Sequence, residues 1–134
     1  MADIPGGFEP HFRSSPLTDP WEPLYSRVTE EAVILGLRAS EQHCNGRGFV
    51  HGGLISALAD NAMGLSCARR HDKPTGLVTV SLNLEFLRAA RRGEWLGFST
   101  TYVKTGRRLD FAQGQVSAAG QACALMTASF AVPD

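Results

Sequence analysis

A histidine and two glycines stand directly before an apolar segment of this chain, and this arrangement is suited to binding an anion. Residues 51–53 read HGG, and a helical pattern of apolar residues begins immediately after them. Glycines at the start of a helix let the backbone approach a ligand closely. The free N–H groups there, with the positive end of the helix dipole, can hold an anion or a developing oxyanion. The plainer alternative is a glycine-rich turn that does no more than reverse the chain.

Asp60 is the one charged residue between residues 53 and 68. On a helical wheel it lies almost opposite the centre of a broad apolar stripe, where a lone aspartate ordinarily marks the solvated face. The stripe consists of Leu54, Ile55, Leu58, Ala59, Ala62 and Leu65. The residues predicted to share the Asp60 face are uncharged and mostly small, namely Ser56, Ala57, Met63, Gly64 and Cys67. Such a face favours the close approach of another backbone or a ligand, which would leave Asp60 partly buried and in need of partners.

The elements that must position these residues follow from the periodicity of the chain. Residues 27–40 predict a strand, 41–50 a loop and 53–70 the main helix. Four further strands are predicted over 76–87, 94–104, 108–118 and 121–132, and the first of these alternates with a period of two. An antiparallel sheet can bury one face against a single helix. We therefore predict an α+β domain over residues 27–134, with about five antiparallel strands wrapped around one long central helix, preceded by a proline-rich arm over residues 1–26.

Composition limits the class of function. The chain has 134 residues, of which 43% are hydrophobic and 19% charged, which suits one soluble globular domain. The formal net charge is zero, but residues 1–41 carry seven acids and three bases, and residues 42–134 carry six acids and ten bases. A modest positive excess in the second part suits a small anionic ligand better than nucleic acid.

The three cysteines, Cys44, Cys67 and Cys123, are odd in number and lack the spacing of metal ligands. We therefore expect no disulfide framework, no metal and a reduced cytoplasmic protein. The first residues have neither a basic start nor an apolar core, so we expect no signal peptide. The low-charge stretch 49–68 contains His51, Asp60 and Asn61, which predicts a buried helix and its approach and no membrane span.

These residues together resemble one known family. Residues 43–53 read HCNGRGFVHGG, and Asp60 follows eight residues after Gly52. This pattern, with Asn45 a short gap before HGG, is similar to that of hotdog-fold thioesterases of the phenylacetate-pathway and 4-hydroxybenzoyl-CoA type. Residues 78–84, VTVSLNL, are similar to the next strand of that family, and the resemblance covers roughly residues 27–132.

The resemblance implies an acyl-CoA thioesterase that needs no cofactor, since coenzyme A is part of its substrate. It implies that the Gly52 N–H polarises the thioester carbonyl and that Asn45 orients this carbonyl or the attacking water. Asp60 would act as general base or nucleophile, and Thr79 would hold the water or the Asp60 carboxylate. It also implies a homodimer or homotetramer in which Asn45 and Gly52 of one subunit face Asp60 and Thr79 of the other.

Two groups of basic residues are candidates for binding coenzyme A. Arg88, Arg91 and Arg92 lie in one predicted loop, and Lys104, Arg107 and Arg108 flank the next turn. Solvated charges at the ends of a sheet are the plainer interpretation. The resemblance favours contacts with the 3′-phosphate and pyrophosphate, to which arginine binds as a bidentate fork. We also place His51 and Gly53 in the substrate-binding loop, with His51 chiefly ordering it.

Three alternatives remain open. Cys44 with His43 or His51 would make a nucleophile pair, although nothing in the sequence orients the base. A hotdog hydratase or dehydratase would need a histidine paired with an acid. A non-catalytic acyl-CoA-binding module would not need Asn45, Gly52, Asp60 and Thr79 together. The acyl group, the choice between dimer and tetramer, and the role of the arm are not determined by the sequence.

Overall fold

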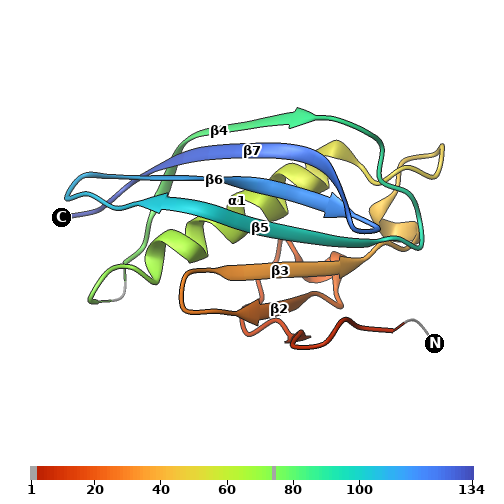
Figure 1. Ribbon diagram of the computed structural model, residues 1–134, viewed down its shortest axis with the longest axis horizontal. Helices are drawn as coiled ribbons and strands as arrows, with labels where there is room; N and C mark the ends of the chain where they lie inside the picture. Colours follow the sequence, from red (N-terminus) through yellow and green to blue (C-terminus); the bar gives the residue numbers. More distant parts are fainter. Residues whose placement is uncertain (1–2, 74) are drawn as a thin grey trace.

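The computed structural model describes residues 3–73 and 75–134, and within them one α-helix, α1 (Gly52–Ala68), lies across a seven-stranded antiparallel sheet (Figure 1). The strands are β1 (Glu9–Pro10), β2 (Tyr25–Val28), β3 (Val33–Arg38), β4 (Val78–Phe86), β5 (Trp95–Lys104), β6 (Leu109–Ala118) and β7 (Gln121–Ala131). Their order across the sheet is β1-β2-β3-β5-β6-β7-β4. Short 3-10 helices span Asp19–Trp21 and Glu41–His43. The sheet wraps around the helix, which is the hotdog fold that the sequence predicts.

The sheet has two strands more than the five predicted, and both arise before residue 29. The apolar run predicted as one strand over 27–40 is a hairpin of β2 and β3. The hydroxyl of Thr29 accepts hydrogen bonds from the N–H groups of Glu31 and Ala32 and closes the turn. The arm supplies β1, which pairs with β2 at the edge of the sheet, where prolines are tolerated.

The core lies between α1 and the inner face of the sheet. The apolar stripe of the helix is buried except for Leu65, which is half-buried. Met63 and Cys67, which lie on the Asp60 side of the helical wheel, are also completely buried. The strongly curved sheet covers a wider arc of the helix than the apolar stripe indicated. Each large side chain buried in this way contributes about 1.5–3 kcal/mol to folding.

β4 forms one edge of the sheet. Within the described residues it pairs with β7 and with no second strand. Its apolar side chains are unusually exposed, with Val78 at 63%, Val80 at 60% and Phe86 at 51%. Exposed apolar side chains on an unpaired edge are typical of a surface that another chain covers. No helix in the described part of the chain is long and apolar enough to cross a membrane.

Candidate active site

Asp60 lies in the middle of α1 and is held by a residue of β4. Oδ1 of Asp60 accepts a hydrogen bond from Oγ1 of Thr79 at 2.7 Å. The aspartate is half-buried and lines a cavity of about 290 Å³ between the helix, the N-terminal arm and the start of β4. Hydrogen bonds to charged acceptors are stronger than those between neutral groups. Asp60 is therefore a positioned carboxylate at a cavity and is more than a mark of the solvated face.

A β-bulge in β4 turns Thr79 toward Asp60. Thr79 pairs with Phe130, the next pair is Ser81 with Ser129, and Val80 is the extra residue. Phe130 is buried on the helix side of the sheet. Its ring packs against Gly64 of α1, where the position that a Cβ would occupy lies 3.4 Å from the ring. Because side chains alternate along a strand, an unbroken register would have put Val80 on this inner face and Thr79 on the outer one. The bulge exchanges the faces of Val80 and Thr79, so that the Thr79 hydroxyl lies beside the Asp60 carboxylate.

At the start of α1, the N–H groups of Gly52 and Leu54 have no acceptor among the described residues. His51 is the N-cap, and its Nδ1 accepts a hydrogen bond from the Gly53 N–H at 2.8 Å. The Ile55 N–H donates to the carbonyl of His51. His51 thus orders the loop, the Gly53 N–H is occupied by that cap, and the Gly52 N–H is available to a ligand.

Asn45 holds a tight loop just before the helix. Its Oδ1 accepts hydrogen bonds from the N–H groups of Arg47 at 2.9 Å and Phe49 at 3.2 Å. Gly48 has a φ of +84°, a left-handed conformation that favours glycine. With its carbonyl oxygen occupied, the Asn45 side chain keeps its amide N–H groups as donors for a ligand.

The first basic loop packs against the Asn45 loop. Phe49 forms a bridge with Arg91, and the Arg92 N–H donates to the carbonyl of Gly48. The guanidinium of Arg91 lies over the Phe49 ring, 5.4 Å from its centroid. Arg88 is half-buried and donates to the carbonyl of Ala118 at 2.6 Å. Its guanidinium is therefore used within the fold, whereas the side chains of Arg91 and Arg92 are exposed.

The second basic turn lies at the other end of the sheet. Lys104, Arg107 and Arg108 are exposed around the β5–β6 turn, while the β4–β5 connection that carries Arg91 lies at the opposite end (Figure 1). Within one subunit the two groups of basic residues are thus far apart.

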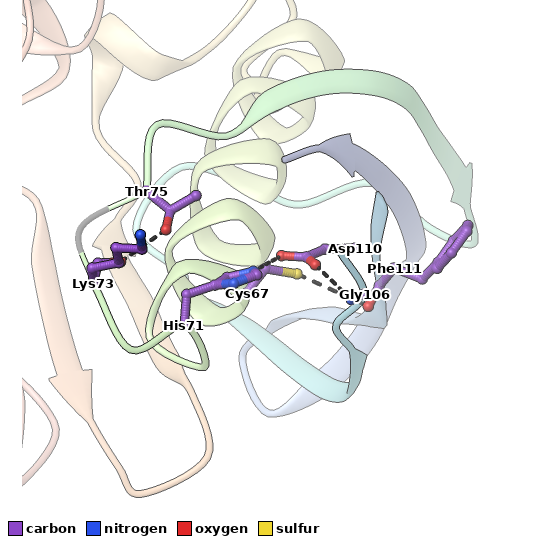
Figure 2. Close-up of polar contacts among 7 residues, drawn as sticks. All are labelled: Cys67, His71, Lys73, Thr75, Gly106, Asp110 and Phe111. Carbon is purple, nitrogen blue, oxygen red and sulfur yellow. Dashed lines mark hydrogen bonds and ion pairs between the residues drawn. The ribbon is translucent and has the colours of Figure 1, made fainter. Parts of the chain in front are cut away.

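A buried pair that the sequence did not reveal fixes this second turn. Asp110, at 0% exposure, accepts a hydrogen bond from Nε2 of His71 at 2.6 Å and another from the Gly106 N–H at 3.1 Å (Figure 2). Burial and the neighbouring Asp110 charge raise the pKa of the Cys67 thiol to about 12, so this thiol stays protonated. The cluster ties the end of α1 to the turn between β5 and β6. Asp110 and His71 are 39 residues apart, and no local pattern links them.

The two halves of the predicted catalytic set are not united within one subunit. Thr79 contacts Asp60, and Asn45 lies in the loop that precedes Gly52. Gly52 precedes Asp60 by eight residues of α1, which corresponds to about 12 Å along the axis. A carboxylate must lie within about 3 Å of the group it serves. One carbonyl therefore cannot contact the Gly52 N–H and the Asp60 carboxylate of the same chain.

The cysteine–histidine alternative does not match the contacts. Nδ1 of His43 accepts from the Ser40 N–H, so Nε2 carries the proton and donates to the carbonyl of Trp21 at 2.8 Å. The Cys44 thiol donates to the carbonyl of Ser40. Both ring nitrogens of His43 are thus occupied by the backbone.

In the described residues, no three side chains of the metal-ligating types come together.

Comparison with known proteins is consistent with this geometry. A family model described as the thioesterase superfamily matches residues 47–124. A Pseudomonas aeruginosa protein named as a candidate esterase is 39% identical over 134 residues, covering 99% of this chain and 100% of that protein. Acyl-coenzyme A thioesterase 13 of Mus musculus is 33% identical over 84 residues, covering 61% of this chain and 58% of that protein. A solved structure of a Bacillus halodurans protein with CoA has a TM-score of 0.78 at 25% identity, covering 92% of this chain and 82% of that chain.

Proposed function

The chain belongs to the thioesterase superfamily, and we propose on that premise that it hydrolyses acyl-CoA thioesters at a site shared between two subunits. Membership of the family makes it a thioester hydrolase. Coenzyme A as the carrier is supported by the mouse relative, which is named an acyl-CoA thioesterase, and by the Bacillus halodurans structure, which holds CoA.

The bond between Thr79 and Asp60 carries the proposed mechanism. It fixes the carboxylate beside a cavity whose floor includes the buried side chains Leu35, Leu58 and Phe130. An apolar floor suits an acyl group, and a half-buried carboxylate suits activation of water at its thioester end. A module that only bound acyl-CoA would gain nothing from an anion held at this point.

A second subunit would complete the site. The unpaired edge of β4 and its exposed apolar side chains support pairing with β4 of another copy. Antiparallel pairing about a two-fold axis would place the start of one α1 beside the middle of the other. Asn45 and Gly52 of one subunit would then face Asp60 and Thr79 of its partner. The same pairing would bring the turn of Arg107 and Arg108 in one subunit toward the Arg91 loop of the other.

The chemistry follows from these positions. The carbonyl oxygen of the thioester accepts from the Gly52 N–H at the positive end of the helix and from the Asn45 amide. Asp60 removes a proton from water, which attacks the carbonyl carbon, and the negative charge moves to the oxygen that Gly52 holds. The intermediate collapses, the carbon–sulfur bond breaks, and the thiolate of coenzyme A takes up the proton. The products are the free acid and coenzyme A.

Direct attack by Asp60 is the other route that the geometry permits. It would form a mixed anhydride and release the thiolate of coenzyme A, and water would then hydrolyse the anhydride. Both routes require the ionised carboxylate and the same oxyanion donors.

A panel of acyl-CoAs, monitored for the release of free thiol, tests this function. We expect turnover of at least one acyl class, and a loss of at least roughly 10²-fold in kcat for Asp60→Asn with the fold retained. Asp72→Asn is the matched control, because it makes the same change at an exposed position outside the cavity. Near-wild-type turnover by Asp60→Asn would exclude Asp60 from the chemistry.

A further inference from the structure

The N-terminal arm forms part of the wall of the cavity that holds Asp60. Residues 11, 13, 14, 15 and 18 line it together with Asp60 and Thr79. The floor of the cavity is apolar. Asp60, Thr79 and Asn61 supply part of its polar lining, and the arm residues supply most of the rest. The arm therefore contacts whatever the cavity holds and is more than a cover for the core.

This part of the arm is fixed in place. The His11 N–H donates to the carbonyl of Leu24 at 2.9 Å, which continues the pairing of β1 with β2. The hydroxyls of Ser15 and Thr18 are 3.0 Å apart, and Thr18 is 3% exposed. A segment held at both ends can present side chains in a constant geometry, which selection among substrates requires.

Arg13 lies toward the end of the cavity remote from Asp60. It lines the cavity that holds Asp60 and also a neighbouring hollow of about 490 Å³, which shares Leu65 and Ala68 with that cavity. Asp60 and Thr79 do not line that hollow, but Arg69 does. Along α1, Ala68 lies eight residues beyond Asp60, or about 12 Å. The space thus runs along the helix from a carboxylate at one end to Arg13 at the other, where the guanidinium of Arg69 already donates to the carbonyl of Thr29.

The charge of Arg13 is not neutralised within the described part of the chain, where no carboxylate lies within ion-pair distance of it. Nearby, Nδ1 of His11 is enclosed and has no hydrogen-bond partner among the described residues. Burial lowers the pKa of His11; the Glu22 charge opposes this shift and the Arg13 charge adds to it, and the net lowering favours the neutral ring. An enclosed nitrogen without a partner is costly, and a polar group of a ligand would relieve that cost.

We propose that the segment from His11 to Thr18 is the specificity wall of the acyl cavity, and that Arg13 selects acyl groups whose far end carries a carboxylate. This inference rests on the proposed thioesterase function and adds its substrate class. The methylene chain lies on the apolar floor, the thioester lies at Asp60, and the terminal carboxylate pairs with Arg13.

Matched acyl-CoA pairs that differ at the far end test this assignment. The pairs are pentanoyl with glutaryl, hexanoyl with adipoyl and octanoyl with suberoyl. For at least one pair we expect the wild-type chain to show a kcat/KM about tenfold or more higher for the carboxylate member, in line with a charge-assisted hydrogen bond. Arg13→Glu should reverse that preference, and Arg13→Lys should retain part of it.

Two controls separate this effect from others. Arg27→Glu makes the same charge change at an exposed arginine of β2 outside the cavity, and it should leave the ratio unchanged. Acyl-pantetheine thioesters lack the phosphates of coenzyme A, and the preference should persist on them. If Arg13→Glu lowers both members of a pair equally on coenzyme A but neither on pantetheine, Arg13 binds phosphate and the inference is overturned.

The remaining outcomes distinguish the selectivity assigned to Arg13 from the proposed thioesterase activity on which it rests. A wild-type chain that hydrolyses the plain acyl-CoAs with no preference in any pair refutes the specificity wall and leaves the thioesterase function intact. A chain inert toward every thioester of an extended acyl-CoA panel refutes the function, and the inference falls with it.

Discussion

The hydroxyl of Thr79 on β4 donates to Oδ1 of Asp60 on α1 over 2.7 Å, and this bond joins the two elements at the cavity. The bulge at Val80 is what puts the hydroxyl on the inner face of the sheet. The candidate site therefore depends on one irregular residue in an otherwise regular strand.

Removing this hydroxyl should impair the reaction more than the fold. Thr79→Val keeps the shape of the side chain and deletes the donor to Asp60. Since a hydrogen bond to a charged group contributes about 1.5–3 kcal/mol, kcat should fall roughly ten- to a hundredfold. Thr79→Ser should restore most of the rate. Steady-state kinetics and thermal unfolding of the three forms provide the check, and equal activity of the valine and serine variants would contradict this role.

The buried Asp110 predicts a strong effect of His71 on stability. His71→Ala leaves a wholly buried carboxylate with one described donor, the Gly106 N–H. We expect the free energy of unfolding to fall by roughly 2–4 kcal/mol, less than for a fully enclosed pair because His71 is partly exposed. Urea unfolding measures this loss, with Asp72→Ala as the exposed control. A loss no greater than that of the control would show that the pair contributes little.

The basic turns should act on the carrier and not on the chemical step. If Arg91, Arg92, Arg107 or Arg108 binds the phosphates of coenzyme A, its replacement by alanine should raise KM several-fold with kcat nearly constant. The rise should disappear with pantetheine thioesters, which lack those phosphates. Arg88→Ala should instead lower stability, because its guanidinium contacts the backbone at Ala118. Identical behaviour of every arginine variant on both carriers would mean that these side chains are only solvated charges.

The edge of β4 should be an interface between subunits. Val80→Lys adds a charge to an exposed apolar position on that edge, and we expect it to yield monomers without activity. Val28→Lys is the matched control, since Val28 is a 47% exposed valine on β2. Light scattering measures the oligomeric state of both variants, and we expect only Val80→Lys to be monomeric. A Val80→Lys form that stays dimeric and active would place the interface elsewhere.

The sequence predicted the parts of this fold that local patterns encode. Helical spacing identified α1, and alternation identified β4. The strands predicted over 94–104, 108–118 and 121–132 match β5, β6 and β7 within one or two residues of their bounds. The turn between β2 and β3 was missed because Thr29-Glu30-Glu31-Ala32 contains neither glycine nor proline, so the two apolar strands read as one. Resemblance to the family implied that Thr79 holds the water or the Asp60 carboxylate, and in the structure a hydrogen bond joins Thr79 to Asp60.

What the sequence could not predict depends on contacts between distant segments. A bulge is a mismatch between two strands, so Val80 cannot be identified from β4 alone. The pair of His71 and Asp110 requires the end of α1 to meet the start of β6. The contribution of His11 and Arg13 to the cavity wall depends on how the arm folds back along β2. Each of these is fixed by tertiary packing, which local composition does not record.

Complementation between two inactive variants tests the shared site most directly. Asn45→Ala and Asp60→Asn each disable a different half of the proposed site, and each should be inactive alone. In a mixed dimer one site carries both lesions and the other carries none. Random pairing makes half of the dimers mixed, so we predict that co-expression or co-refolding restores up to about a quarter of wild-type activity. Verified heterodimers that remain as inactive as the parents would contradict a site built from Gly52 of one subunit and Asp60 of the other.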